Sequence, residues 1–145
     1  MPSWVNEGYQ EYARRLPREC RLRLTEISLG QRTRSTAVER AVNEEGKRML
    51  AATTARQRVI AMDVAGRCWS TEQLADKMAS WLQDGRDVSL LIGGPDGLSN
   101  ACLERAEQRW SLSALTLPHP LVRVLLAEQL YRAWTVISNH PYHRS

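Results

Sequence analysis

The sequence predicts an α/β protein whose mostly parallel sheet is covered by helices on both faces. Short apolar runs alternate with helical patterns along the chain, and this order is typical of parallel sheets. Two of the apolar runs, which end at Ile92 and Leu117, break into segments rich in Gly and Pro. Strand ends that open into such loops are where α/β proteins bind ligands. We therefore expect one domain, residues 1–145, with about four strands and a ligand site at one end of its sheet.

The first part of the chain predicts a helix, a strand and a polar loop. Residues 3–16 carry apolar side chains at helical spacing, and Pro17 ends that pattern. Residues 20–27 partly alternate between apolar and polar, which predicts a half-exposed strand. Residues 28–35 are too polar to pack, so we expect a mobile loop there.

The middle of the chain predicts two capped helices, each followed by a strand. Thr36 and Glu39 have the spacing of a capping box, as do Ser70 and Gln73. The first helix is expected to run to about residue 52, and the second to end at Gly85. The strands that follow them are predicted over 58–63, with a turn over 64–68, and over 87–92.

The last third predicts a short helix over 99–109, a strand over 110–117 and the longest helix from Pro120 to about residue 137. Proline suits the first turn of a helix because its missing N–H has no partner there. Apolar residues cover more than one stripe of this long helix, so it needs two packing partners. The sheet is one of them, and a second copy of the chain is the other that we expect.

Composition favours a soluble, cytoplasmic protein without a metal. No stretch has the roughly 20 apolar residues of a membrane span, and no signal peptide pattern opens the chain. The three cysteines are widely spaced and the three histidines have no ligand cluster beside them. Residues 1–58 hold 12 Lys and Arg against 7 Asp and Glu, so a basic flank suits a polyanion. A solvated surface that reflects Arg-rich codon usage explains the same charge.

The two loops that follow the apolar runs differ in their chemistry. Gly93, Gly94 and Gly97 lack the side chains that would keep a ligand away from the main chain. In the second loop, Pro118 and Pro120 remove two backbone donors around His119. We expect His119 to be structural and to shape this loop through a backbone hydrogen bond.

Three segments in fitting order resemble a known family. VSLLIGGPDGLS from Val88, WSLSALTLPHPLVRVLLAEQLYRAW from Trp110 and the tail NHPYHR from Asn139 are similar to the bacterial enzymes that methylate N3 of a pseudouridine in 23S ribosomal RNA. These enzymes are a group of the SPOUT methyltransferases. The resemblance extends over nearly all of the chain, and the GGPDGL and PHPLVR segments are its most specific parts.

The resemblance implies a fold, a cofactor and an assembly. It implies a SPOUT-type domain with a C-terminal trefoil knot, which general fold rules would not suggest. It also implies a homodimer and S-adenosylmethionine bound in the knot, largely by main-chain groups. Carried onto this sequence, the cofactor-binding residues are Met62, Asp63, Gly93, Gly94, Ser113, Ala114, Leu115, Thr116, Leu117 and Pro118. Met62 stands where leucine is usual. The family usually has about ten residues before the position of Met1 that form a first strand, so this strand is apparently missing here.

The tail carries the groups that proton removal from a uridine-like N3–H requires. With the resemblance, we expect the catalytic residues to be His143, Tyr142, Arg132 and Arg144. His143 is suited to accept a proton, Tyr142 to stack on the base or share its proton, and Arg144 to hold phosphate or steady the anion. His143, Tyr142 and a water molecule all stay open as the base.

Each of these features also has a structural explanation that involves no function. The tail is otherwise a frayed terminus, and Glu128 and Arg132 are spaced to pair along one helix. The uncharged stretch 113–118 suits a cationic sulfonium, but by periodicity alone it is a buried strand end. The expected activity is transfer of a methyl group from S-adenosylmethionine to a 23S rRNA pseudouridine on the ribosome. The alternative is an RNA- or nucleotide-binding module that keeps the fold without turnover.

Overall fold

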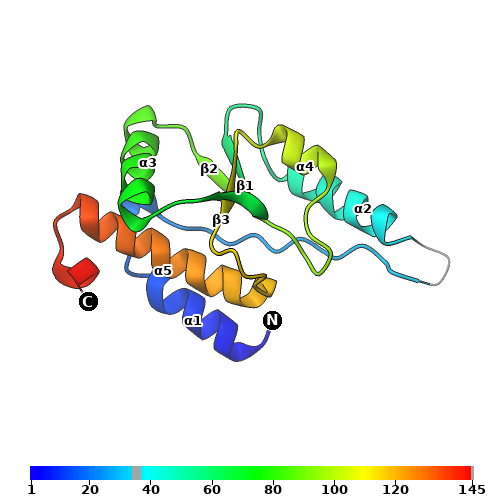
Figure 1. The fold of residues 1–145 in the computed structure, drawn as a ribbon, viewed down its shortest axis with the longest axis horizontal. Coiled ribbons are helices and arrows are strands. Elements are labelled where there is room, and N and C mark those ends of the chain that lie inside the picture. The colour runs from blue at the N-terminus through cyan, green and yellow to red at the C-terminus, as the bar shows by residue number, and fades with distance from the viewer. Residues whose placement is uncertain (34–36, 145) are drawn as a thin grey trace.

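The computed structural model describes residues 1–33 and 37–144, and it has a central three-stranded parallel sheet in the order β2-β1-β3. The strands are β1 (Arg58–Cys68), β2 (Val88–Ile92) and β3 (Gln108–Ser111). Figure 1 shows β1 in the middle of the molecule with helices on either side. The predicted α/β class is therefore confirmed, with three strands in the described residues where we expected about four.

Helices cover both faces of the sheet, as the alternating pattern predicts. They are α1 (Ser3–Ala13), α2 (Val38–Ala51), α3 (Thr71–Asp84), α4 (Asn100–Arg105) and α5 (His119–Ile137), with 3-10 turns η1 (Arg18–Cys20) and η2 (Pro141–Arg144). Successive residues of a strand point to opposite faces. Ile60 is accordingly buried in a cluster with residues of α3 and α5, whereas Val59 is buried with Cys102 of α4. Helix α1 packs on α5, outside the first of these layers.

Local signals set the ends of two helices where the sequence predicts them. The Ser70 hydroxyl accepts from the Gln73 N–H, and the Gln73 side chain accepts in turn from the Ser70 N–H, which completes the capping box of α3. Gly85 ends α3 with φ 79°, a left-handed conformation that favours glycine. Ala37 is the N-cap of α2, and the expected cap residue Thr36 lies outside the described residues.

The predicted strand over 20–27 is wrong. After η1 the chain is irregular, because a strand needs a neighbour whose N–H and C=O groups it can pair. A cavity of about 1060 Å³ separates this segment from the free edge of β2, and both line it. The alternation of apolar and polar residues is therefore present without the ladder that it predicts.

The strand boundaries on either side of β3 also differ from the prediction. The expected turn over 64–68 belongs to β1, where Met62 and Arg67 both pair with Trp110 and the residues between them bulge out of the ladder. Strand β3 covers 108–111 where we expected 110–117. It ends because the Ser111 hydroxyl donates to the Ser113 carbonyl oxygen (2.7 Å) and the Ser113 hydroxyl accepts from the Leu115 N–H (2.9 Å). These side chains replace the ladder as backbone partners.

The structure has no helix long and apolar enough to span a membrane among the residues that it describes. The trefoil knot implied by the resemblance stays a prediction.

Candidate functional site

Three segments leave the sheet at the same end. Met62 in β1 pairs with Ile92 of β2 on one side and with Trp110 of β3 on the other. The residues that follow these three positions are Asp63, Gly93 and the start of the 111–118 segment. The parallel register therefore brings the predicted cofactor-binding residues of β1, β2 and β3 to one edge (Figure 1).

The glycine loop after β2 is closed on itself. The Gly97 N–H donates to the Gly94 carbonyl oxygen (3.1 Å), and Gly97 has φ 80°. A Cβ atom at Gly93 would lie 2.6 Å from the Gly97 carbonyl carbon, which is too close for any side chain. Gly93 and Gly97 are thus required by the turn itself, beyond the access that they give to a ligand.

The loop from Ser113 to Pro118 offers main-chain groups to a ligand. Leu115 is 73% exposed, and the backbone of Thr116 and Leu117 enters none of the hydrogen bonds found among the described residues. The loop carries no charge and ends at Pro118, the N-cap of α5. Free peptide groups and apolar side chains without a positive charge fit the chemistry of the cationic donor S-adenosylmethionine.

Met62, Asp63 and His119, at the same end of the sheet, make contacts within the protein. Met62 is partly buried against the core cluster that contains Ile60 and Trp110. The Asp63 carboxylate accepts from the Ala65 N–H (3.3 Å) and so shapes the bulge of β1. His119 is the first residue of α5 and, with Gly93 and Gly94, lines one part of the cavity beside β2. The backbone hydrogen bond that we expected for His119 stays a prediction.

A buried carboxylate that sequence reasoning missed braces the glycine loop. Glu45 of α2 is 3% exposed and accepts from the Gly30 N–H (2.9 Å) and from Arg32 Nη1 (2.7 Å). The Arg32 Nε donates to Asp96 in the glycine loop (2.7 Å). Burial raises the pKa of Glu45, but the bonds from Arg32 and Gly30 outweigh it and hold this pKa below its ordinary value.

The expectation that residues 28–35 are too polar to pack is wrong for the described part of this segment. The segment packs through charge pairing, because Gly30 is buried and Arg32 joins two carboxylates. Residues 34 and 35 of the expected mobile loop lie outside the described residues. The sequence did carry one signal, since Glu45 lies four residues after Ala41, on the inward face of the predicted helix.

The tail is folded onto α5 and is not frayed. The Tyr142 hydroxyl donates to Glu128 Oε1 (3.1 Å), and Arg132 binds the same carboxylate (2.7 Å). The Arg132 guanidinium also lies over the Tyr142 ring, 5.0 Å from its centroid. Burial and the Glu128 carboxylate raise the pKa of Tyr142 to about 12. The expected Glu128–Arg132 pair along the helix is confirmed.

The four predicted catalytic residues are only partly brought together. His143 lies in η2 beside Tyr142, and its Nδ1 is buried without a hydrogen-bond partner among the described residues. Buried polar atoms usually have a hydrogen-bond partner, so this nitrogen is an exception among the described residues. Arg144 is in the same turn, but its side chain lies outside the described part of the structure.

The tail and the loop 113–118, which carries predicted cofactor-binding residues, lie at opposite ends of α5. The loop 113–118 leads into the first residue of α5, and η2 follows its last turn. A helix of 19 residues is about 28 Å long at 1.5 Å per residue. Figure 1 shows the C-terminal turn and the start of α5 at the two ends of this helix. His143 therefore does not reach the loop 113–118 of its own chain in this arrangement.

Among the residues that the structure describes, no group of three or more His, Cys, Asp or Glu side chains is placed to hold a metal ion.

Comparison with known proteins gives one consistent family. The sequence model of a family described as "Predicted SPOUT methyltransferase" matches residues 1–143. The chain is 62% identical to the "Ribosomal RNA large subunit methyltransferase H" of Methylococcus capsulatus, over 99% of this chain and 93% of that protein. Proteins of the same name from a Marinomonas species and from Saccharophagus degradans are each 58% identical, with the same shares covered. The strand ends at Met62 and Gly93 and the loop 113–118 thus lie in a chain that belongs to the SPOUT methyltransferase family.

Proposed function

We propose that this chain is a ribosomal RNA large subunit methyltransferase that transfers a methyl group from S-adenosylmethionine to N3 of a 23S rRNA pseudouridine on the ribosome. The names of its relatives support the rRNA substrate. The observation that carries the proposal is the convergence of Met62, Gly93 and the uncharged loop 113–118 at one end of a parallel sheet. Because its proposed substrate is the ribosome, we expect this activity in the cytoplasm.

The residues of this edge would hold the donor through their main chain. When bound, S-adenosylmethionine supplies an electrophilic methyl group on a sulfonium. Uncharged walls and carbonyl groups in the loop 113–118 suit that positive sulfur better than Arg or Lys side chains would. Gly93 and Gly94 let the adenosyl part approach the backbone of the neighbouring loop.

The tail would supply the proton chemistry. Methyl transfer needs the N3 lone pair, so the N3 proton must pass to a base as the new N–C bond forms and the methyl carbon leaves sulfur. His143 suits this role because imidazole is the side chain that proteins use most often as a general base, and no described residue hydrogen-bonds to its Nδ1. Tyr142 suits it poorly, since a phenol whose pKa is raised to about 12 keeps its proton near neutral pH. Arg132 and Glu128 would hold the Tyr142 ring in place.

A homodimer through α5 would join the two halves of the site. Leu121 and Leu125, one turn apart on α5, are each 39% exposed although the opposite side of the helix is buried. Trp4 of the neighbouring helix α1 is 53% exposed. Apolar residues exposed on two packed helices favour a second copy as their partner. If the two α5 helices of a dimer run in opposite directions, each tail would lie near the loop 113–118 of the other copy.

Two measurements test the proposed function. Calorimetry with S-adenosylhomocysteine should show binding to the wild-type chain. Incubation with tritium-labelled S-adenosylmethionine and ribosomes from a strain that lacks the enzyme should then label 23S rRNA, and nucleoside analysis should place the label on N3 of a pseudouridine. Binding without transfer would instead identify the chain as a module that keeps the fold without turnover.

A further inference from the structure

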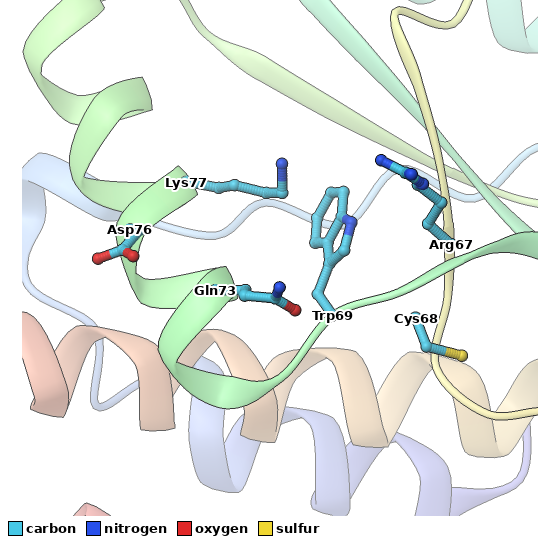
Figure 2. A pocket seen from close by; sticks show the side chains of 6 residues that line it. All are labelled: Arg67, Cys68, Trp69, Gln73, Asp76 and Lys77. Carbon is cyan, nitrogen blue, oxygen red and sulfur yellow. The ribbon is translucent and has the colours of Figure 1, made fainter.

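A basic depression borders the end of the sheet that carries the predicted cofactor-binding residues, on the side of α3. Its cavity of about 640 Å³ is lined by residues from the end of β1 and the first turns of α3, namely Arg67, Cys68, Trp69, Gln73, Asp76 and Lys77 (Figure 2). Cys68 pairs with Ser111 of β3, which lies two residues before the loop 113–118. The depression is therefore next to the segment that enters the candidate donor site.

The floor of the depression is a fixed indole ring. Trp69 stacks on Trp110 with 4.7 Å between ring centroids and 12° between planes, and it lies tilted against Trp81 at 6.4 Å. Trp110 and Trp81 are both buried in the core cluster. Because its neighbours cannot move without disturbing that core, the Trp69 ring holds one position.

Two cations, Arg67 and Lys77, line the depression around this ring. The Lys77 ammonium lies over the Trp69 ring, 4.5 Å from its centroid, a distance at which the ring quadrupole attracts it. Figure 2 shows the Arg67 guanidinium on the other side of the indole, whereas Asp76 points away from it. Among the described residues, neither Arg67 nor Lys77 forms an ion pair. Their charges are thus left for a ligand.

A phosphodiester fits this arrangement better than a stacked base. One face of Trp69 is covered by Trp110, and the other lies under the ammonium of Lys77. A base would have to displace that ammonium before it could stack. A phosphate oxygen can instead meet the ammonium and accept hydrogen bonds from the planar guanidinium of Arg67.

We propose that Arg67 and Lys77 bind the phosphodiester backbone of the RNA substrate next to the methylated nucleotide, with Trp69 holding the Lys77 ammonium in place. This proposal rests on the proposed function for its RNA partner. The proposed RNA contact lies on the side of the molecule opposite α2. It includes neither the tail nor the predicted cofactor-binding loops after β2 and β3.

The two lysines of the chain allow a direct test, because Lys47 on α2 is an internal control for Lys77. Wild-type protein is acetylated with an amine reagent, with and without bacterial ribosomes, and mass spectrometry gives the rate at each lysine. We expect ribosomes to slow acetylation of Lys77 about fivefold or more while Lys47 changes little. Equal rates at Lys77 with and without ribosomes, at concentrations that saturate transfer, would overturn the proposal.

Variants give a second readout that does not depend on turnover. Arg67→Ala and Lys77→Ala should each weaken binding of free 23S rRNA about fivefold near 0.15 M salt, the factor expected for one lost phosphate contact, and should flatten the salt dependence. Lys77→Arg should restore most of the affinity, and Lys47→Ala is the matched control. Unchanged affinity for S-adenosylhomocysteine shows that the variants are folded. RNA affinity that stays at the wild-type value in both alanine variants would also overturn the proposal.

The outcomes separate this contact from the proposed activity. Transfer to ribosomes without protection of Lys77 refutes the contact and leaves the activity. Protection of Lys77 without transfer supports the contact and refutes the activity. The absence of both refutes both.

Discussion

Glu45 is the residue whose surroundings the sequence reveals least. It is a carboxylate in the core, and its two partners, Gly30 and Arg32, come from a segment whose composition predicts a loose loop. A buried charge is tolerated only when it is paired and hydrogen-bonded, so the segment 28–33 is held where α2 needs it. Through Asp96, Arg32 extends this pairing to the glycine loop.

Replacing Glu45 by Gln should lower the free energy of unfolding by about 1–3 kcal/mol near neutral pH, because the charge that pairs with Arg32 is lost. The pKa of Glu45 is lowered in the folded chain, so its contribution is complete above the ordinary glutamate pKa. It is lost as the pH falls through the lowered pKa. Denaturant unfolding of both proteins between pH 3 and 7 should therefore give curves that converge at the acid end.

Asp96→Asn is the matched control for this experiment, because Asp96 pairs with the same arginine from a more exposed position. An exposed pair contributes about 0–1 kcal/mol, so this variant should change stability little. A difference between wild type and Glu45→Gln that stays constant with pH would show that Glu45 is not ionised in the folded protein.

Tyr142 and His143 should differ in their effect on transfer. Tyr142→Phe removes the hydroxyl that donates to Glu128, which weakens tail docking by about 0.5–1.5 kcal/mol. His143→Ala should slow single-turnover transfer by about 10²–10⁴ if it removes the base, with the affinity for S-adenosylhomocysteine almost unchanged. A loss of activity in Tyr142→Phe as large as in His143→Ala would assign the proton chemistry to the phenol. A parallel loss of cofactor affinity in His143→Ala would place the tail in the donor pocket.

At the scale of elements, the contact of α2 with α4 leaves no space for a side chain at Gly46. A Cβ atom there would lie 2.1 Å from the Ser99 hydroxyl and 2.8 Å from its Cβ. Ser99 is the buried N-cap of α4, and its hydroxyl accepts from the Cys102 N–H. The glycine thus lets two helices approach over the face of the sheet that contains Val59.

Gly46→Ala should accordingly destabilise the protein by about 1–3 kcal/mol through overpacking, although alanine is the better helix former. Gly8→Ala in α1 is the control, since its Cβ would meet only the side chain of Val124, at 3.2 Å, which can shift slightly. Thermal unfolding of the two variants compares them directly. Equal midpoints would mean that α2 and α4 move apart without cost.

At the scale of the whole molecule, the tail and the predicted donor-binding loop 113–118 lie at opposite ends of α5. Each chain has both parts, but about 28 Å of helix lies between them. One copy therefore has an incomplete site in the proposed mechanism. The exposed Leu121, Leu125 and Trp4 lie on the two helices that would meet a second copy.

A mixing experiment tests whether two copies share each site. Gly93→Val should abolish donor binding, because a side chain at this position collides with Gly97. His143→Ala should be inactive through loss of the base. After the two inactive variants are unfolded and refolded together in equal amounts, about half of the dimers should be heterodimers, each with one intact site of two. The mixture should therefore recover about a quarter of wild-type activity. No recovery despite proven heterodimers would place both functions in one chain.

Sedimentation measures the assembly itself. Leu125→Glu should shift the protein from dimer to monomer, because it puts a charge into an apolar contact. Val38→Glu is the control, as Val38 is 49% exposed on α2, away from α1 and α5. A wild-type chain that sediments as a monomer would remove the basis of the shared site.

Part of the fold could be predicted because its causes are local. The capping box of Ser70 and Gln73 and the left-handed Gly85 depend on a few neighbouring residues, and both are confirmed. The strand over 20–27 could not be judged in this way, because a strand exists only if another chain segment pairs with it. Likewise, the end of β3 depends on where β1 ends beside it, at Cys68.

The alternation of strands and helices, the loops at Gly93 and Pro118 and the resemblance to SPOUT methyltransferases follow from the sequence alone. They depend on periodicity, backbone preferences and motifs. Which segments meet is known only from the three-dimensional fold. It paired Glu45 with Arg32, placed Arg67 and Lys77 around Trp69, and put the tail at the far end of α5 from the donor loops. The physical reason is that charge pairing, ring contacts and strand ladders join residues far apart in the chain, and their energies depend on distances that no local pattern contains.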